Sequence, residues 1–252
     1  MISLVICSRK KILDTVLLQN LEVTIGIPFD IVFIDNSENQ YDIFEAYNKG
    51  VQLSKHDLLC FMHDDILYKT QNWGKKVLDH FSNEFIGAIG VAGTPYMSVI
   101  PGTWWSSNIV AQNIIHDGKK DIQYYKPYFN SSSPYQIKSV PVALLDGVWF
   151  CVRKKLFDTI QFDEINYKGF HIYDMDISMQ IQQQGCGLVC VYDIDIEHKS
   201  IGKLDIHWLN NRLSFYKKWK SLLPFSVVPF NVKEKMIFEY RNLISFLKIK
   251  YK

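Results

Sequence analysis

The sequence lacks the glycine-rich signatures of two large classes of nucleotide-binding enzyme. No GxGxxG segment follows the first predicted strand, and the P-loop pattern GxxxxGK[ST] occurs nowhere in the 252 residues. Both patterns place glycines where the backbone must approach a phosphate group closely. Their absence disfavours dinucleotide-dependent oxidoreductases and P-loop enzymes.

Cysteine pairs, a leader and membrane spans are also missing. The five cysteines are odd in number, contain no CxxC pair and mostly lie in apolar runs, so we expect reduced core residues. In MISLVICSRKK the positive charges follow a short apolar run, the reverse of a signal peptide. No segment approaches the length that crosses a bilayer. These absences predict a cytoplasmic protein.

The composition is that of an ordinary globular chain. Hydrophobic residues make up 48% and charged residues 21%, and the net charge is +2, so disorder is disfavoured and one sizeable α/β domain is expected, with or without a helical tail. The charge is uneven, because residues 212–252 contain ten Lys or Arg but only Glu234 and Glu239. The C-terminal part is therefore basic.

Apolar runs alternate with amphipathic stretches from the beginning of the chain. Strands are predicted at 2–7, 30–35 and 57–62, with helices at 10–23 and 41–55 between them. Continuous β-branched runs separated by helices are typical of a parallel sheet with right-handed crossovers.

The pattern becomes less regular further along. A helix is predicted near 71–84 and a strand at 86–93, whereas residues 95–141 lose their periodicity and are expected to form a long loop region. Strand, turn, strand and short helix follow over 141–157. A helix at 173–185 and a strand ending at His198 complete this part.

The segment that starts at residue 206 has the pattern of a basic amphipathic helix. Its apolar residues step by three or four, whereas Arg212, Lys217, Lys218 and Lys220 mostly fall elsewhere on the helix. Such a tail either rests on an anionic membrane surface or docks on the domain and exposes a solvated lysine face.

Polar residues follow the predicted strands at the point where each strand ends. Asp35 and Asn36 end the second strand, and His63, Asp64 and Asp65 follow the third. Open α/β sheets bind ligands beyond the carboxyl ends of their strands. Strand alternation puts His63 and Asp65 on one side and Asp64 on the other. Carboxylates with an imidazole suit Mn²⁺ or Mg²⁺ carrying diphosphate oxygens, although a strand-end aspartate can equally be a cap.

A set of motifs in this order resembles the GT-A glycosyltransferases of family 2. ISLVICSRK resembles the first strand of that family, VFIDNS its VDDGS region, AYNKG its ARNxG segment and FMHDDI the strand ending in its DxD motif. LLDGVWFCVRKKLF and YDMDISMQIQQQGCGLV resemble its GG…RR..F and ED.D segments. The resemblance covers residues 2–66 and 145–198, and the pattern is similar to a bacterial subfamily with HDD in place of DxD.

The resemblance implies a GT-A fold, in which a mixed, mainly parallel sheet is flanked by helices. Residues 1–203 would form the glycosyltransferase domain and residues 204–252 an amphipathic basic helical extension. Asp65 would bind the metal, and His198 either adds a ligand or is structural. The nucleotide part of the donor would contact the following residues: Ser8, Arg9, Asp35, Asn36, His63 and Asp64.

The same resemblance implies roles near the sugar. Asp174 would be the general base, because it occupies the catalytic aspartate position, or else it only stabilises a helix start. Asp176 would anchor the helix or contact the acceptor. Asp146 and Gly147 would form a turn beside the sugar or a plain hairpin turn. Trp104 would stack on the acceptor or anchor the long loop.

The implied activity moves a sugar from a nucleotide-diphosphate donor to a saccharide or lipid-linked saccharide. The first candidate for the donor is a UDP-sugar. The transfer would proceed with inversion and with Mn²⁺ or Mg²⁺, in bacterial surface polysaccharide synthesis at the inner face of the membrane and without nucleic acid. Two alternatives stay open. A nucleotidyltransferase would use a similar domain, although CSRKK lacks its glycines. A degenerate domain that binds nucleotide or glycan without turnover is suggested by His63 in place of aspartate.

Overall fold

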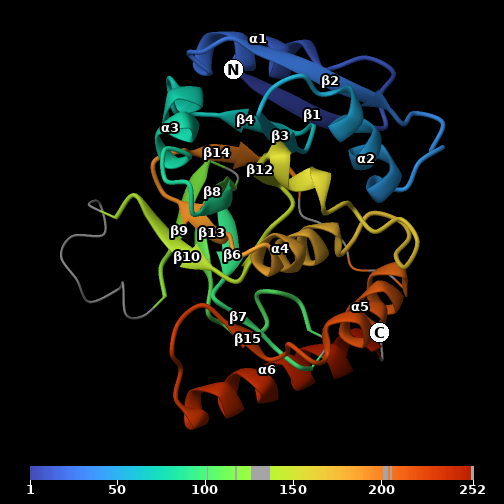
Figure 1. Ribbon diagram of the computed structural model, residues 1–252, viewed down its shortest axis with the longest axis vertical. Helices are drawn as coiled ribbons and strands as arrows, with labels where there is room; N and C mark the ends of the chain where they lie inside the picture. The colour runs from blue at the N-terminus through green and yellow to red at the C-terminus, as the bar shows by residue number, and fades with distance from the viewer. Residues whose placement is uncertain (101, 117, 126–136, 201–203, 205, 251–252) are drawn as a thin grey trace.

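A seven-stranded sheet forms the centre of the computed structural model, which describes residues 1–100, 102–116, 118–125, 137–200, 204 and 206–250 (Figure 1). Its strands lie in the order β10 (Ser139–Val142), β13 (Gly187–Val191), β5 (Ile86–Gly90), β12 (Trp149–Arg153), β3 (Leu58–Met62), β1 (Ile2–Ser8) and β2 (Phe29–Asp35). Strands β10 and β12 run antiparallel to their neighbours, and the other five share one direction. The sheet is therefore mixed and mainly parallel, as predicted.

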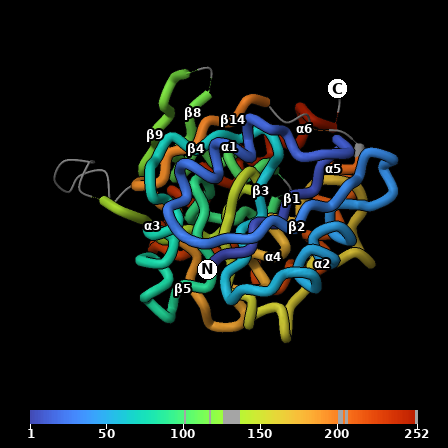
Figure 2. The backbone as a smooth tube through the Cα atoms, turned by 90° about the horizontal axis from the view of Figure 1, so that it is seen from above, coloured from blue at the N-terminus to red at the C-terminus, as the bar shows by residue number. Residues whose placement is uncertain are grey.

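Helices cover both faces of this sheet, because the strands are apolar on both sides. Strand β1 shows the division: Ile2, Leu4 and Ile6 pack on one face, and Val5 packs on the other. The first face is covered by α1 (Thr15–Thr24) and α3 (Trp73–His80), and the second by α2 (Ile43–Leu53) and α4 (Tyr173–Gln183). Figure 2 shows α1 and α2 on opposite sides of β1 and β2.

A second, smaller sheet lies beside the first. Its order is β11 (Leu144–Leu145), β6 (Ala92–Thr94), β8 (Ala111–His116), β14 (Ile196–His198) and β4 (Ile66–Tyr68), and β9 (Lys119–Gln123) pairs with β8. Strand β7 (Tyr96–Met97) pairs with β15 (Phe225–Ser226). The expectation of a long loop over 95–141 is therefore wrong for β7, β8, β9 and β10. Strand β7 has only two residues, β10 contains Pro141, and β8 and β9 are rich in polar residues, so hydrophobic periodicity does not reveal them.

The turn between β11 and β12 and the short 3-10 helix η3 (Lys154–Asp158) follow the prediction for residues 141–157. Asp146 and Gly147 lie in that turn. Strands β11 and β12 belong to different sheets, and Trp149 at the start of β12 lies opposite Met62 at the end of β3, so the turn lies at the carboxyl end of β3.

Two helices form the C-terminal segment, α5 (Ile206–Trp219) and α6 (Val232–Lys250), and both pack on the rest of the chain. Phe215 of α5 and Phe238 of α6 are buried. Arg212, expected on a solvated face, is only 2% exposed; its Nε donates to the carbonyl of Gly102 at 2.9 Å and its guanidinium lies over the Phe215 ring. Of the two predicted alternatives, docking on the domain therefore holds for the face of α5 that carries Arg212. The predicted boundary at 203/204 adjoins residues outside the described ones.

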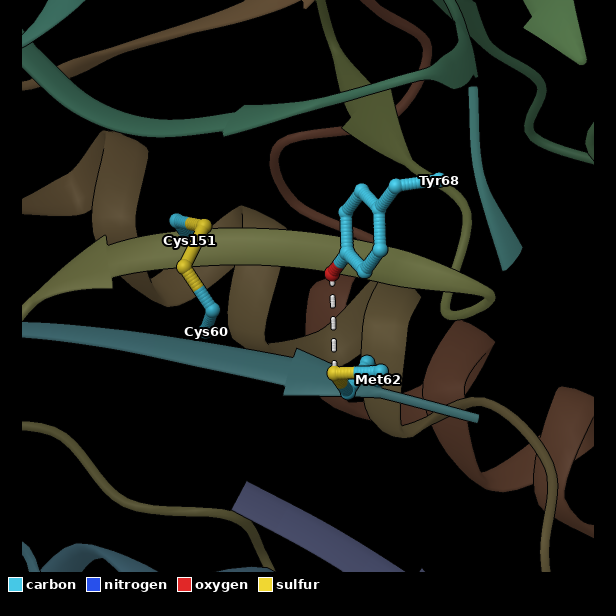
Figure 3. Close-up of a disulfide and its surroundings, with 4 residues drawn as sticks. All are labelled: Cys60, Met62, Tyr68 and Cys151. Atoms are coloured by element: carbon cyan, nitrogen blue, oxygen red, sulfur yellow. Dashed lines mark hydrogen bonds between the residues drawn. A yellow bond between two sulfur atoms is a disulfide. The ribbon is translucent and has the colours of Figure 1, made fainter. Parts of the chain in front are cut away.

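A disulfide joins Cys60 of β3 to Cys151 of β12, which face each other in the antiparallel pair (Figure 3). The expectation that all five cysteines are reduced is wrong for these two, because the register brings their Cα atoms to 3.9 Å. Sequence spacing could not reveal this pairing across 91 residues. In the same layer, the Tyr68 hydroxyl donates to Met62 Sδ at 3.5 Å.

Candidate functional site

The carboxyl ends of β1, β2 and β3 meet at one edge of the main sheet. Ser8 at the end of β1 lies opposite Asp35 at the end of β2, and Ile6 lies opposite Met62 of β3. The predicted strand-end residues are therefore neighbours, since parallel strands end at the same edge.

The residues expected to contact the nucleotide differ in how many of their polar atoms are already hydrogen-bonded within the protein. Ser8 donates to Asp64 Oδ2 at 2.5 Å, which ties two of them together. Asp35 is exposed, and a hydrogen bond from the Ser37 backbone to its carboxylate lowers its pKa. Asn36 is fully buried and uses its amide on both backbone groups of Tyr41, at 2.9 and 3.0 Å.

Arg9 is exposed at the edge of this region. Its guanidinium lies 5.1 Å from the centroid of the Phe170 ring, and Phe170 lines the cleft described below. The N–H groups of the Arg9 guanidinium therefore lie at the protein surface next to the cleft.

His63, Asp65 and His198 form a cluster whose ligand atoms all lie within 4.8 Å of one another. The Oδ1 atom of Asp65 lies 3.4 Å from His198 Nε2 and 3.9 Å from His63 Nδ1, and the two imidazole nitrogens are 3.4 Å apart. Asp64 points to Ser8 instead, so the three residues lie as strand alternation predicts. His198 reaches the cluster because β14 pairs with β4, which places it opposite Ile66.

The electrostatics of this cluster favour deprotonated ligands. Burial and the neighbouring His198 lower the pKa of His63, so its imidazole is neutral at physiological pH. Burial alone would raise the pKa of Asp65, but hydrogen bonds from His198 and Ser200 outweigh it and hold that pKa far below the usual range. A neutral imidazole and an ionised carboxylate are the forms that bind metals.

The spacing of these atoms fits one divalent cation. An octahedral ion with bonds of about 2.1 Å has neighbouring ligand atoms about 3 Å apart. The three separations here are 3.4, 3.4 and 3.9 Å, so a small contraction would let the three side chains share one ion.

A cleft of about 590 Å³ opens next to the cluster. His63 and His198 line one part of it, and the turn between β11 and β12 and the start of α4 line another. The residues predicted for the sugar side that line it are Trp104, Asp146, Gly147 and Asp174. His198, a predicted metal ligand, and Asp174, the predicted base, therefore line one cavity, and Asp65 Oδ1 lies 3.4 Å from His198 Nε2.

Asp174 lies in the first turn of α4 and is held by backbone donors. Its Oδ2 accepts from Gly147 N at 3.0 Å and its Oδ1 from Met175 N at 2.8 Å. Burial, with the nearby carboxylate of Asp146, raises the pKa of Asp174 to about 7. A carboxylate with this pKa can exchange a proton near neutral pH.

Gly147 and Tyr173 form a contact that the sequence did not indicate. A Cβ atom at position 147 would collide with the Tyr173 hydroxyl, so only glycine fits there. The Tyr173 hydroxyl donates to the carbonyl of Gly147 at 3.1 Å and lies 3.3 Å from His63 Nε2. Tyr173 thereby links the turn, the cation cluster and α4. A lone tyrosine before an aspartate carries no pattern that would have revealed this.

Asp146 and Trp104 are held together in the wall of the cleft. The Trp104 indole donates to Asp146 Oδ2 at 2.8 Å, and Val148 N donates to the other carboxylate oxygen at 2.9 Å. Three polar residues of β8 and β9 line the same cleft and were also missed: Gln112, His116 and Asp121.

Asp176 lies away from the cleft. It is 1% exposed and accepts four hydrogen bonds, from Tyr167, Gln180, Lys218 and Trp219. An acceptor cannot reach a carboxylate that is enclosed in this way. The expected acceptor contact is therefore corrected, and of the two predicted roles only the anchoring role fits.

Comparison with known families agrees with this fold. Residues 4–214 match the model of a family described as "Glycosyltransferase like family". Because the match spans most of the chain, the protein belongs to this family. Streptomycin biosynthesis protein StrF of Streptomyces griseus is 25% identical over 197 residues, which are 74% of this chain and 64% of StrF. The chain thus spans less than two thirds of that relative.

Solved GT-A glycosyltransferases share the architecture. GalNAc-T7, solved with UDP, GalNAc and Mn²⁺, superposes with a TM-score of 0.59 at 12% identity, over 100% of this chain and 56% of GalNAc-T7. TarS 1–349 of S. aureus in complex with UDP-GlcNAc gives 0.54 at 11% identity, over 98% of this chain and 72% of TarS. At these identities the likeness concerns the fold, which is the predicted GT-A fold.

Proposed function

We propose that the protein transfers a sugar from a nucleotide-diphosphate donor to a hydroxyl of a saccharide or lipid-linked saccharide, with inversion. The observation that carries the proposal is one cleft lined by His63, His198 and Asp174, at the strand ends of a glycosyltransferase-family chain. Asp65 forms a cluster with the two histidines. Such a cleft brings a cation-bound diphosphate and a base together at one reacting centre.

Asp174 would take the proton from the acceptor hydroxyl as the new bond forms. Its raised pKa suits this role, because a carboxylate with a pKa near 7 is a stronger base than an ordinary aspartate and is still ionised in part at neutral pH. Backbone donors from Gly147 and Met175 fix its orientation. The proposed roles of Trp104 and Asp146 are to contact the sugar or acceptor from the wall of the cleft.

His63, Asp65 and His198 are the proposed ligands of the divalent cation. When bound, the cation would supply positive charge that stabilises the departing nucleotide diphosphate. Two imidazole nitrogens suit Mn²⁺ better than Mg²⁺, which prefers oxygen ligands. We therefore propose Mn²⁺, in preference to Mg²⁺, as the cation that the cluster binds. His63, assigned to the nucleotide on the basis of the resemblance, is reassigned here to the cation.

The nucleotide would lie along the ends of β1 and β2. Ser8, Arg9, Asp35 and Asp64 are the proposed contacts, and the buried Asn36 would hold the loop after β2 rather than touch the ligand. UDP is the proposed nucleotide, supported by the UDP and UDP-GlcNAc in the structures of GalNAc-T7 and TarS. A role in bacterial surface polysaccharide synthesis remains part of the proposal.

The product of the reaction separates the candidate functions. Calorimetry with UDP, GDP and CMP, with and without Mn²⁺, measures metal-dependent binding, and incubation with the corresponding nucleotide sugars and saccharide acceptors follows. A glycosyltransferase releases nucleoside diphosphate from a nucleotide-diphosphate sugar, whereas a nucleotidyltransferase releases pyrophosphate when it is given a nucleoside triphosphate and a sugar 1-phosphate. Binding without turnover of any donor would indicate the non-catalytic alternative and contradict the proposal.

Asp174→Asn tests the base directly. We expect kcat to fall about 10²-fold or more, with the affinity for UDP changed by less than about twofold. Asp158→Asn is the matched control, because Asp158 is an exposed carboxylate of η3 outside the cleft. If the Asp174 variant keeps the turnover of the control, Asp174 is not the base.

A further inference from the structure

Helix α6 carries an apolar stripe on its outer side. Successive members are three or four residues apart, so they lie along one face of the helix within an arc of about 80°. Their exposed fractions are large: Val232 74%, Met236 67%, Tyr240 64%, Leu243 38% and Leu247 38%. We refer to these five residues as the α6 stripe.

Residues of α6 outside the stripe fix the helix against the protein. Phe238 and Asn242 are buried, and the Glu239 carboxylate accepts hydrogen bonds from Tyr96, Ser98 and the backbone of 99–100. The helix therefore cannot rotate to bury the α6 stripe. Figure 1 shows α6 along the outer edge of the molecule, at the end opposite α1.

The charges around the α6 stripe are mainly positive. Exposed lysines lie in the first and last turns of the helix, at Lys233 and Lys248. Both acidic residues of α6 are engaged, because Glu239 accepts the hydrogen bonds named above and Glu234 accepts one from the Asn231 backbone at 2.9 Å. An apolar face bordered by basic side chains is complementary to a bilayer with anionic headgroups. A second copy would bring like charges together.

A groove of about 940 Å³ runs between α6 and the segment 103–108. Tyr240 of the stripe and Lys248 line it, and it shares Thr103, Trp105 and Leu204 with the cleft of the candidate site. The side of α6 that carries Tyr240 is thus continuous with the cleft.

We propose that α6 lies in the interface of an anionic membrane, with the α6 stripe inserted among the headgroups. No helix of the described residues is long and apolar enough to cross a bilayer, so the contact is peripheral. A further consequence rests on the proposed function: a lipid-linked acceptor held in that membrane would reach the cleft through the groove. The membrane contact itself does not depend on the transferase activity.

Vesicle sedimentation with the full chain tests the proposal. Vesicles of phosphatidylcholine, with and without phosphatidylglycerol, are compared for the wild type and for the double variant Val232→Gln/Met236→Gln. These substitutions leave the charge unchanged and remove apolar surface. The matched control is Ile12→Gln/Ile165→Gln, whose side chains lie outside α6 and are 76% and 81% exposed.

We expect the wild type and the control to bind vesicles that contain phosphatidylglycerol, and the stripe variant to bind at least about tenfold more weakly. A wild type that stays in the supernatant, or a control that loses as much binding as the stripe variant, overturns the proposal. A stripe variant that turns a dimer into a monomer without vesicles also overturns it, in favour of a second copy. Calorimetry with UDP on the same samples shows whether the nucleotide site is intact, so failure of the proposed function is seen separately.

Discussion

The carboxylate of Asp174 accepts a hydrogen bond from the backbone N–H of Gly147 at 3.0 Å. This bond ties the first turn of α4 to the turn between β11 and β12, two elements that come together only in the folded chain. Tyr173 strengthens the same junction, because its hydroxyl donates to the Gly147 carbonyl and contacts His63. The proposed base and the proposed cation ligands are therefore positioned by one rigid junction.

The pH dependence of the reaction follows from the pKa of Asp174. The proposed base works only when ionised, and burial beside Asp146 raises its pKa to about 7. We expect kcat/KM to rise about tenfold per pH unit below pH 7 and to level off above it. Steady-state rates measured from pH 5 to pH 9 check this. A rate that stays flat down to pH 5 would show that no group with this pKa acts as base.

Ionisation of Asp174, which should raise the activity as the pH increases, should also lower the stability of the fold. Because the folded-state pKa of Asp174 is raised from 3.8 to about 7, the folded protein holds a proton between these values that the unfolded chain releases. The contribution of Asp174 to the free energy of unfolding is therefore present at low pH and lost as the pH rises through about 7.

Asp174→Asn removes this titration. We expect the free energy of unfolding of the variant minus that of the wild type to be larger at pH 8 than at pH 5, by on the order of 1–3 kcal/mol. Urea unfolding at both pH values measures the change, and any pH-independent loss of a hydrogen bond cancels in the comparison. The same difference at pH 5 and pH 8 would contradict the assigned pKa.

Gly147 offers a test of the junction itself. Gly147→Ala places a Cβ where the Tyr173 hydroxyl lies, so the tyrosine or the turn must move. We expect kcat to fall at least about tenfold, because small displacements of a positioned base are costly. Gly185→Ala is a control for glycine replacement in general, since nothing lies near its Cβ position, although its φ of 77° carries local strain. A Gly147→Ala enzyme with wild-type kcat would show that the junction does not position Asp174.

The parts of the fold that sequence predicted are those with continuous buried runs. Strands β1, β2 and β3 and helix α4 are predicted close to their bounds, because β1 and β3 are buried on both faces, β2 contains a continuous apolar run, and α4 begins with acids and ends before a glycine. The grouping of His63 with Asp65 also followed from strand alternation. Local pattern and burial agree at these positions, so a single sequence suffices.

The parts that were missed depend on contacts between distant segments. Strand β8 contains Asn113, a fully buried amide whose partners are Ile194 and Asp195, and polar residues of this kind hide a strand from periodicity. The sequence places Arg212 on a solvated face of α5, whereas in the fold its side chain is buried. The Cys60 and Cys151 pairing needed the register of two strands. In each case tertiary contacts override the local pattern.

The preference of the site for a metal can be altered at His63. His63→Asp replaces an imidazole nitrogen with a carboxylate oxygen, which suits Mg²⁺ better. We expect activity with Mg²⁺ to rise relative to Mn²⁺, and His63→Ala to weaken binding of both ions. Mn²⁺ binding followed by electron paramagnetic resonance, with Mg²⁺ as competitor, measures this. Unchanged Mn²⁺ affinity in both variants would remove His63 from the ligands.

Asp176 holds α5 against α4, and removing its charge should therefore destabilise the fold. Asp176→Asn leaves an oxygen for Tyr167 and Trp219 but removes one of the two carboxylates near Lys218 Nζ, which lies 2.9 Å from Asp176 and 2.7 Å from Asp163. Losing a charged partner from a buried hydrogen-bond network costs about 1–3 kcal/mol, so the midpoint of urea unfolding should fall. Glu38→Gln is the control, because the pair that Glu38 forms with Lys11 is largely exposed and should contribute about 0–1 kcal/mol. Equal midpoints for the two variants would mean that α5 is held by its apolar contacts alone and that Asp176 does not anchor it.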